Sequence, residues 1–132
     1  ACSGVEPSAE AVAAGLKLSA HHDLKTGTAD VLDFADGAFD MVVYGCCLTY
    51  CDRKDLFKVA QEGDRVLADG GFIVVYEFCT DIPYRNAYAH KPGAYCYKMR
   101  YADLFSWNPI YSVVHHQLVS HRHHKHVSLR KH

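Results

Sequence analysis

The sequence has no long apolar run. Every window of eighteen residues contains a charged residue or a strong turn former, which excludes a membrane-spanning helix. Proline is scarce, with four residues, and no proline-rich or low-complexity linker interrupts the chain. Residues 1–10 lack a basic stretch followed by an apolar run, so no secretory signal peptide is indicated and we expect a cytoplasmic protein.

The composition is that of one globular domain. The chain has 132 residues, of which 49% are apolar and 22% charged, enough for a single hydrophobic core. We therefore expect one domain over 1–132. Three of the six cysteines fall within residues 46–51, which is unlike a secreted disulfide framework, and we expect reduced thiols.

Charge is divided unevenly along the chain. Residues 1–81 hold 14 acidic against 6 basic side chains, whereas 82–132 hold 8 basic against 1 acidic. Seven of the ten histidines follow residue 114. The run at 121–126, with His115 and His116, is either a divalent-metal site or a solvated turn; the interspersed Arg122 and Lys125 favour the turn, and we expect no metal.

Strand and helix patterns alternate through the first 76 residues. Ser8 is a good N-cap for a helix over 9–14 that Gly15 would close. Apolar residues recur at helical spacing after Asp52 until the turn at 69–71. Strands are expected at 2–5, 23–26, 39–45 and 72–76.

Two of these strands are almost continuously apolar. Residues 39–45 and 72–76 show little polar alternation, which predicts burial on both faces, as in a parallel sheet between helices. A strand, a helix and a strand with such burial form a βαβ unit. The fold class is therefore α/β, with an open and mostly parallel sheet.

The C-terminal part has a different character. Residues 82–111 are rich in tyrosine and basic side chains, which predicts a loop-rich cap with a short helix at 103–105. The β-prone runs between 112 and 129 predict an antiparallel hairpin at the sheet edge, within 112–132.

Four segments in this order resemble the class I S-adenosylmethionine-dependent methyltransferases. They are residues 4–8 (GVEPS), 27–32 (GTADVL), 36–43 (DGAFDMVV) and 65–72 (RVLADGGF). The resemblance extends almost from end to end. It implies a Rossmann-like sheet with strand order 3-2-1-4-5-7-6 and S-adenosylmethionine as cofactor.

The resemblance also assigns cofactor-binding residues. Glu6, at the end of a strand, can accept both hydrogen bonds of a ribose diol. It could equally be a solvated acid that favours the start of the next helix. The family places an acid against the adenine amino group, which corresponds to Asp30, with Val31 packing on the ring. The floor of the pocket corresponds to Tyr44, Gly45 and Cys46.

The methyl acceptor is expected to lie beside this pocket. The residues that would face it are Leu48, Tyr50, Cys51, Tyr84 and His90. Tyr50 and His90 are the candidates for a catalytic base, against the plainer interpretation that the tyrosine packs and the histidine is a bystander. Cys46, Cys47 and Cys51 lack a paired C-x-x-C motif, so they are expected to line the core or pocket rather than to bind zinc.

One diagnostic element of the family is not found in the sequence. No G-x-G occurs, and only three residues precede Gly4, so the chain begins where the family's second strand would lie. The first strand is central in this fold, and its loss leaves a gap of roughly 10 Å between two unpaired edges. Direct pairing of the flanking strands, a strand from a second copy, or a longer protein could fill it.

Two functions follow from these expectations. The first is methyl transfer from S-adenosylmethionine to a small-molecule acceptor by in-line displacement, with an affinity reduced by the missing glycine-rich turn. The alternative is an inactive, methyltransferase-like remnant that serves as an oligomeric binding module, with copies associating by strand pairing. Phosphate contacts and base stacking by residues 84–111 could bind nucleic acid, but an acceptor pocket is the favoured interpretation.

Overall fold

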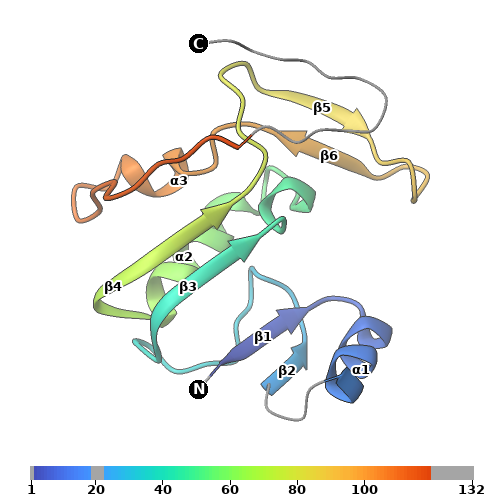
Figure 1. Cartoon of the computed structure of the whole chain (residues 1–132), viewed down its shortest axis with the longest axis horizontal. Coiled ribbons are helices and arrows are strands. Elements are labelled where there is room, and N and C mark those ends of the chain that lie inside the picture. Colours follow the sequence, from blue (N-terminus) through green and yellow to red (C-terminus); the bar gives the residue numbers. More distant parts are fainter. Residues whose placement is uncertain (1, 19–22, 120–132) are drawn as a thin grey trace.

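The computed structural model describes residues 2–18 and 23–119 (Figure 1). The elements are β1 (Ser3–Glu6), α1 (Ala9–Leu18), β2 (Asp23–Thr26), β3 (Phe39–Gly45), the 3-10 helix η1 (Leu48–Tyr50), α2 (Leu56–Val66), β4 (Leu67–Tyr76), β5 (Tyr84–Ala87), β6 (Tyr95–Lys98) and α3 (Asp103–Ser106). Three two-stranded sheets result: β1–β2 and β3–β4 are parallel, and β5–β6 is antiparallel. No helix in these described ranges is long and apolar enough to span a membrane.

The first unit is a parallel strand pair joined by α1. β1 pairs with β2 from Ser3 opposite Asp23 to Glu6 opposite Thr26. The predicted cap is confirmed, since the Ser8 hydroxyl accepts the Ala11 N–H at 3.2 Å. The predicted end of the helix at Gly15 is wrong, because α1 continues to Leu18. A Cβ at position 15 would lie 2.7 Å from Leu24 Cδ1, so close packing on β2 explains this glycine better than capping does.

The second unit is the predicted β3–α2–β4 arrangement. β3 and β4 pair in parallel, with Met41 opposite Phe72 and Gly45 opposite Tyr76. α2 begins at Leu56, later than the expected cap at Asp52. Residues 69–71 do not precede the strand but lie within β4, where the register shifts opposite residues 39–41 and Gly70 adopts a φ of +78°. A glycine permits this irregularity because its positive φ carries no Cβ penalty.

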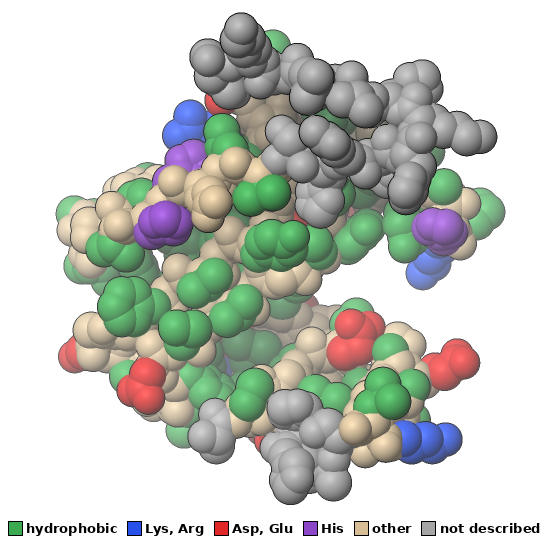
Figure 2. Space-filling model, viewed as in Figure 1, with side chains coloured by type: hydrophobic (Ala, Val, Ile, Leu, Met, Phe, Trp, Pro, Cys, Tyr) green, Lys and Arg blue, Asp and Glu red, His purple; other side chains and the backbone are tan. Residues whose placement is uncertain are grey.

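Only one face of the β3–β4 pair is covered in the described part of the chain. α2 lies behind the two strands in Figure 1, and Figure 2 shows hydrophobic side chains gathered on the face toward the viewer. The prediction of burial on both faces is therefore wrong for residues 2–18 and 23–119, because no helix described there packs on this side. We call this surface the open face; its side chains are Met41, Val43, Phe72, Val74 and Tyr76, between 39% and 59% exposed.

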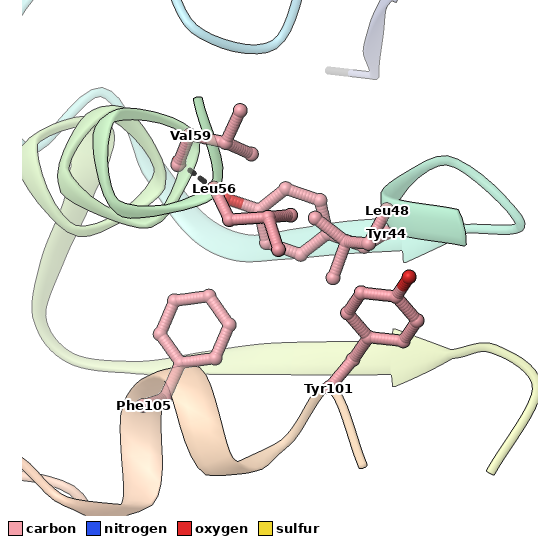
Figure 3. Close-up of a cluster of buried hydrophobic side chains, with 6 residues drawn as sticks. All are labelled: Tyr44, Leu48, Leu56, Val59, Tyr101 and Phe105. Carbon is pink, nitrogen blue, oxygen red and sulfur yellow. Dashed lines mark hydrogen bonds between the residues drawn. The ribbon is translucent and has the colours of Figure 1, made fainter. Parts of the chain in front are cut away.

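The hydrophobic core lies on the other face. Leu56 and Val59 of α2 pack against side chains from β3, η1 and the α3 region (Figure 3). The buried cluster consists of Tyr44, Leu48, Leu56, Val59, Tyr101 and Phe105. The Tyr44 hydroxyl donates a hydrogen bond of 3.0 Å to the Val59 carbonyl, which satisfies the one polar group that this ring brings into the core.

The two parallel units are not joined by strand pairing. Direct pairing of β1 with β3, one of the three expected ways to close the gap, does not occur among the described strands. The loop over residues 27–38, which connects the two units, is anchored to α2 through Arg65 and Glu62. β1 to β4 nevertheless point in the same direction (Figure 1).

The antiparallel hairpin predicted for the C-terminal part is present, but at a different position. It is formed by β5 and β6, inside the expected cap, because β-prone tyrosines flank a turn in which Gly93 has a φ of +80°. Residues 112–119 form no strand, and 120–132, with the histidine run 121–126, lie outside the described residues. The short helix expected at 103–105 is confirmed as α3.

The contact between Tyr44 and Gly63 yields a first prediction. A Cβ at position 63 would collide with the Tyr44 hydroxyl, so Gly63→Ala should lower the free energy of unfolding by about 1–3 kcal/mol. At an open helix position the same change would stabilise by up to about 1 kcal/mol. Urea unfolding measures the difference. The double variant Gly63→Ala/Tyr44→Phe should recover part of the loss, and Gly45→Ala, where a Cβ meets nothing within 4 Å, is the matched control.

Candidate cofactor site at the carboxyl edge of the parallel strands

The carboxyl ends of β1 to β4 lie toward the same side of the molecule (Figure 1). In open α/β sheets, ligands bind at this edge. Glu6 ends β1, the segment Gly45–Cys47 leaves β3, and Glu77 follows β4. This edge therefore gathers two carboxylates and the backbone of a tight loop.

Glu6 has a local role at the start of α1. Its Oε1 accepts the backbone N–H of Ser8 at 2.9 Å, and the side chain is exposed. This contact fits the plainer interpretation of Glu6, an exposed acid that favours the start of the next helix. The contact occupies one of the two carboxylate oxygens. The contact also holds the carboxylate at the end of β1, where the cofactor role requires it.

Asp30 and Val31 lie in a tight turn after β2. The Val31 N–H donates to the Thr28 carbonyl at 3.2 Å. A hydrogen bond from the Thr28 side chain holds the pKa of Asp30 below its usual value, so this acid is ionised at neutral pH. Val31 is 60% exposed. An anionic acceptor and an exposed apolar side chain are thus adjacent, as recognition of an adenine ring requires.

Arg65 of α2 fixes the loop that carries this turn. Its guanidinium donates to the carbonyl oxygens of Leu32 and Phe34, each at 2.8 Å, and to Asp36 at 2.7 Å. Glu62 accepts two further bonds from Arg65 and one from the Leu32 N–H at 2.8 Å. These bonds, those from Arg65 first, lower the pKa of Glu62 to about 2.

The loop after β3 is strained. Cys46 has a φ of +52°, a left-handed conformation that is uncommon for a residue with a side chain. Its N–H donates to the Tyr76 carbonyl at 2.9 Å, which continues the β3–β4 ladder by one residue. The side chains of Tyr44 and Leu48 belong to the core. At these two positions only the backbone is left to line a cofactor pocket.

Glu77 is a site residue that sequence reasoning missed. Its Oε1 accepts the Leu48 N–H at 2.6 Å, and the N–H groups of Cys47 and Thr49 also favour its charged form. Its Oε2 is buried, with no hydrogen-bond partner among the described residues. Burial is the main influence and raises the pKa of Glu77 above the usual glutamate value. The signal in the sequence is an acid directly after a buried strand, which is too common to be diagnostic.

The thiols of Cys47 and Cys51 lie among the acids of this edge. A hydrogen bond to Cys51 raises the pKa of Cys47, and burial and the charges of Glu77 and Glu6 add to the effect. The same bond lowers the pKa of Cys51, whereas burial, Glu77 and Asp30 oppose the change. The charge of Glu6 thus acts on the pKa of Cys47, and that of Asp30 on the pKa of Cys51.

All six cysteines are unpaired, as expected. In the described part of the chain, no group of three or more His, Cys, Asp or Glu side chains is placed to hold a metal ion.

The predicted acceptor residues are brought together only in part. Tyr50 and Tyr88 meet edge to face at 5.1 Å between ring centroids, and Tyr88 meets His90 at 5.3 Å. Tyr50 and His90 are thus linked through Tyr88, which the sequence had not singled out. Tyr84 lies on β5, where Lys98 is 5.8 Å from its ring centroid. Burial raises the pKa of Tyr50, which disfavours it as a base at neutral pH.

Two surface hollows in the structure are lined by other residues. One, of about 550 Å³, is bordered by Phe57, Met99, Asp103, Leu104 and Trp107. The second, of about 250 Å³, is bordered by Cys79, Thr80, Asp81, Ile82 and Leu118. Neither contains a residue predicted to bind cofactor or acceptor.

Comparison with known structures defines the class of fold. A SAM-dependent methyltransferase from Methanosarcina mazei is 16% identical, with a TM-score of 0.67, and the match covers 79% of this chain and 66% of that one. A SAM-dependent methyltransferase from Leishmania major is 15% identical, with a TM-score of 0.64, over 79% and 43% of the two chains. A third, from Mesorhizobium loti, is 18% identical, with a TM-score of 0.51, over 75% and 47%.

The chain thus has the Rossmann-like α/β fold of these enzymes, and the predicted fold class is confirmed. It spans just under two thirds of the first structure and less than half of the other two. Among curated proteins, none matches this chain. The family of the methyltransferase domain matches residues 1–75, which is more than half of the sequence. The chain belongs to this methyltransferase family, as its four sequence segments predict.

The hydrogen bonds from the Arg65 guanidinium to the carbonyl oxygens of Leu32 and Phe34, which we call the Arg65 fork, yield a second prediction. Lysine cannot reproduce several directed N–H donors, so Arg65→Lys should lower the free energy of unfolding by about 1–3 kcal/mol. Glu62→Gln tests how much the negative charge of Glu62 contributes to the free energy of unfolding. Because folding lowers the pKa of Glu62, its contribution to stability is present above its unfolded pKa, near pH 4.5, and is lost as the pH falls toward 2.

The measurement is thermal unfolding of both chains at a series of pH values. The difference between the original chain and Glu62→Gln should be largest above pH 4.5 and should shrink toward pH 2. A difference that does not change with pH would contradict the proposed ion pair.

Proposed function

We propose that this chain binds S-adenosylmethionine at the carboxyl edge of β1–β4 and transfers its methyl group to a small-molecule acceptor. Membership in the methyltransferase family supports the cofactor, and so do structural neighbours described as SAM-dependent methyltransferases. The observation that carries the proposal is the turn of Asp30 and Val31, an ionised acceptor beside an exposed apolar side chain, held in place by the Arg65 fork.

The side chains of this edge suit the nucleoside half of the cofactor. Asp30 would accept from the adenine amino group, while Val31 packs against the ring. Glu6 would accept from the ribose with the carboxylate oxygen that does not bind Ser8. Gly45 and Cys46 would offer backbone groups to the methionine end, and Tyr44 would support them from the core. The described residues hold no glycine-rich turn, so we expect weak binding.

The chemistry asks little of the protein beyond position. When bound, the cofactor supplies an electrophilic methyl group: the acceptor's lone pair forms a bond to the methyl carbon while the carbon–sulfur bond breaks, and S-adenosylhomocysteine leaves. The chain's own contribution is to align acceptor and methyl group and to exclude water. If the acceptor must lose a proton, the raised pKa of Tyr50 disfavours it as the base and leaves His90 as the other predicted candidate.

Residues 82–111 would form the acceptor side of a single domain over 1–132, with 112–132 at its edge. Tyr50 and His90, linked through Tyr88, would supply an aromatic surface for the acceptor, with Cys51 next to Tyr50 in the chain, and Tyr84 would approach from β5. Leu48 would contribute only backbone, because its side chain is fully buried. Unpaired thiols are consistent with a reducing compartment such as the cytoplasm.

Calorimetric titration with S-adenosylhomocysteine tests the proposed function. The unsubstituted chain should release or absorb heat on binding. Asp30→Asn should weaken binding about tenfold, which corresponds to about 1.4 kcal/mol, because it removes the charge that accepts from the adenine amino group. Glu6→Ala should weaken it similarly.

Glu10→Ala is the matched control for Glu6→Ala, because Glu10 is also an exposed acid at the start of α1. Its affinity should equal that of the unsubstituted chain. Absence of heat at millimolar ligand would overturn the proposed cofactor site, and equal affinities in all four chains would overturn the assigned residues.

The open face favours a second function, an oligomeric binding module. Its side chains form a continuous apolar surface, because Met41 is opposite Phe72 and Val43 is opposite Val74. The edge of β3 that faces away from β4 pairs with no described strand. Exposed apolar patches of a few hundred Å² and unpaired edges both favour association. A second copy is the proposed partner, since one copy carries both features.

Sedimentation of Val43→Glu tests this association. The unsubstituted chain should sediment as a dimer or larger, and a charge at the centre of the open face should shift it toward monomer. Phe57→Glu is the control, because Phe57 is 71% exposed but lies on α2, behind the sheet. A monomeric unsubstituted chain, or equal effects of both changes, would contradict the binding-module function.

A further inference from the structure

Glu77 connects the end of β4 to the loop that follows β3. The two strands are neighbours, so the residue after β4 lies beside the residues after β3. The Glu77 Oε1 accepts the Leu48 N–H at 2.6 Å, and Leu48 itself is fully buried. Glu77 therefore binds a segment that the buried Leu48 side chain already anchors in the core.

The segment between these anchors is the strained one. Cys46, with a φ of +52°, lies two residues before Leu48. On its other side, its own N–H is bound to the Tyr76 carbonyl at 2.9 Å. A left-handed residue with a side chain persists only where its surroundings enforce it. The Tyr76 carbonyl binds the N–H of Cys46 itself. Glu77, the next residue in the chain, binds the N–H of Leu48 on the other side of Cys46.

We propose that Glu77 is the positioning residue of the cofactor site: its carboxyl group fixes the loop over residues 45–49 and so sets where the backbone of Gly45 and Cys46 meets the ligand. This inference rests on the proposed cofactor site. Glu77 would act through the loop, since its Oε1 binds the Leu48 N–H and its Oε2 is buried with no hydrogen-bond partner among the described residues.

The surroundings of Glu77 couple this role to proton binding. The negative charge of Glu77 acts to raise the pKa of the Cys47 and Cys51 thiols and of the Tyr101 phenol, so ionisation of these groups and of Glu77 is mutually unfavourable. Among the described residues, the groups that favour the charged form of Glu77 are the backbone N–H groups of residues 47–49, and burial opposes them and raises its pKa. Ionisation of Glu77 should therefore be felt directly at the Leu48 amide.

The experiment compares Glu77→Gln with Glu77→Leu in the full chain labelled with nitrogen-15. Glutamine retains an acceptor oxygen, whereas leucine has a similar volume and none. In Glu77→Leu the exchange of the Leu48 amide proton should accelerate at least tenfold, while that of Val59 in α2 stays unchanged. Glu77→Gln should retain the Leu48 protection. Glu10→Leu, at an exposed acid, is the control.

Two further readouts extend the test. The Leu48 amide shift should titrate with a midpoint above the usual glutamate pKa in the original chain and should be flat in Glu77→Gln. Affinity for S-adenosylhomocysteine should fall at least tenfold in Glu77→Leu and less than threefold in Glu77→Gln. Three results would each overturn the inference. They are preserved protection of the Leu48 amide in Glu77→Leu, equal acceleration of exchange at Leu48 and Val59, and a Leu48 amide shift that titrates identically in the original chain and in Glu77→Gln.

The two proposals can fail separately. If the unsubstituted chain shows no heat with S-adenosylhomocysteine but Leu48 exchange responds as expected, the cofactor site is wrong and the hold of Glu77 on the loop is correct. If ligand binds equally well to Glu77→Leu, the cofactor site stands and the positioning role is wrong.

Discussion

The guanidinium of Arg65 links two parallel strand pairs that are not joined by pairing between any of the described strands. β1 and β2 form one parallel pair, and β3 and β4 form another. The loop over residues 27–38 connects the two pairs. Arg65 binds that loop at two carbonyl oxygens and one carboxylate, and it does so from α2, a helix packed firmly on the second pair. A single planar side chain thus anchors the loop between the two pairs through directed bonds, while the edge of β3 that faces away from β4 pairs with no described strand.

Much of the fold could be predicted from local patterns. The apolar runs at 39–45 and 72–76, with a helical period between them, identified the β3–α2–β4 unit, because each pattern reflects burial on its own element. Patterns failed where the structure depends on distant partners. The continuous apolar runs predicted two covered faces and could not show that no described helix packs on the second face of β3–β4. Gly15 resembled a helix end, although Leu24 of β2 is what requires a glycine there.

The candidate site shows the same division. Glu6 and Asp30 were located from short segments, since an acid at a strand end has a recognisable position. Glu77 was missed because its importance arises from the neighbouring loop, which folds back so that Leu48 donates to it. Tyr44 and Leu48 were expected in the pocket because of their sequence position, whereas their side chains lie on the core side of the same loop. Sequence gives the position along a strand, but the side that a loop residue faces depends on packing.

The distribution of the thiols gives the molecule a built-in reporter. Cys46 is exposed at the strained turn, whereas Cys47 and Cys51, further along the same segment, are half-buried. A maleimide should therefore label Cys46 faster than Cys47 and Cys51, and opening of this corner should narrow the difference between their labelling rates.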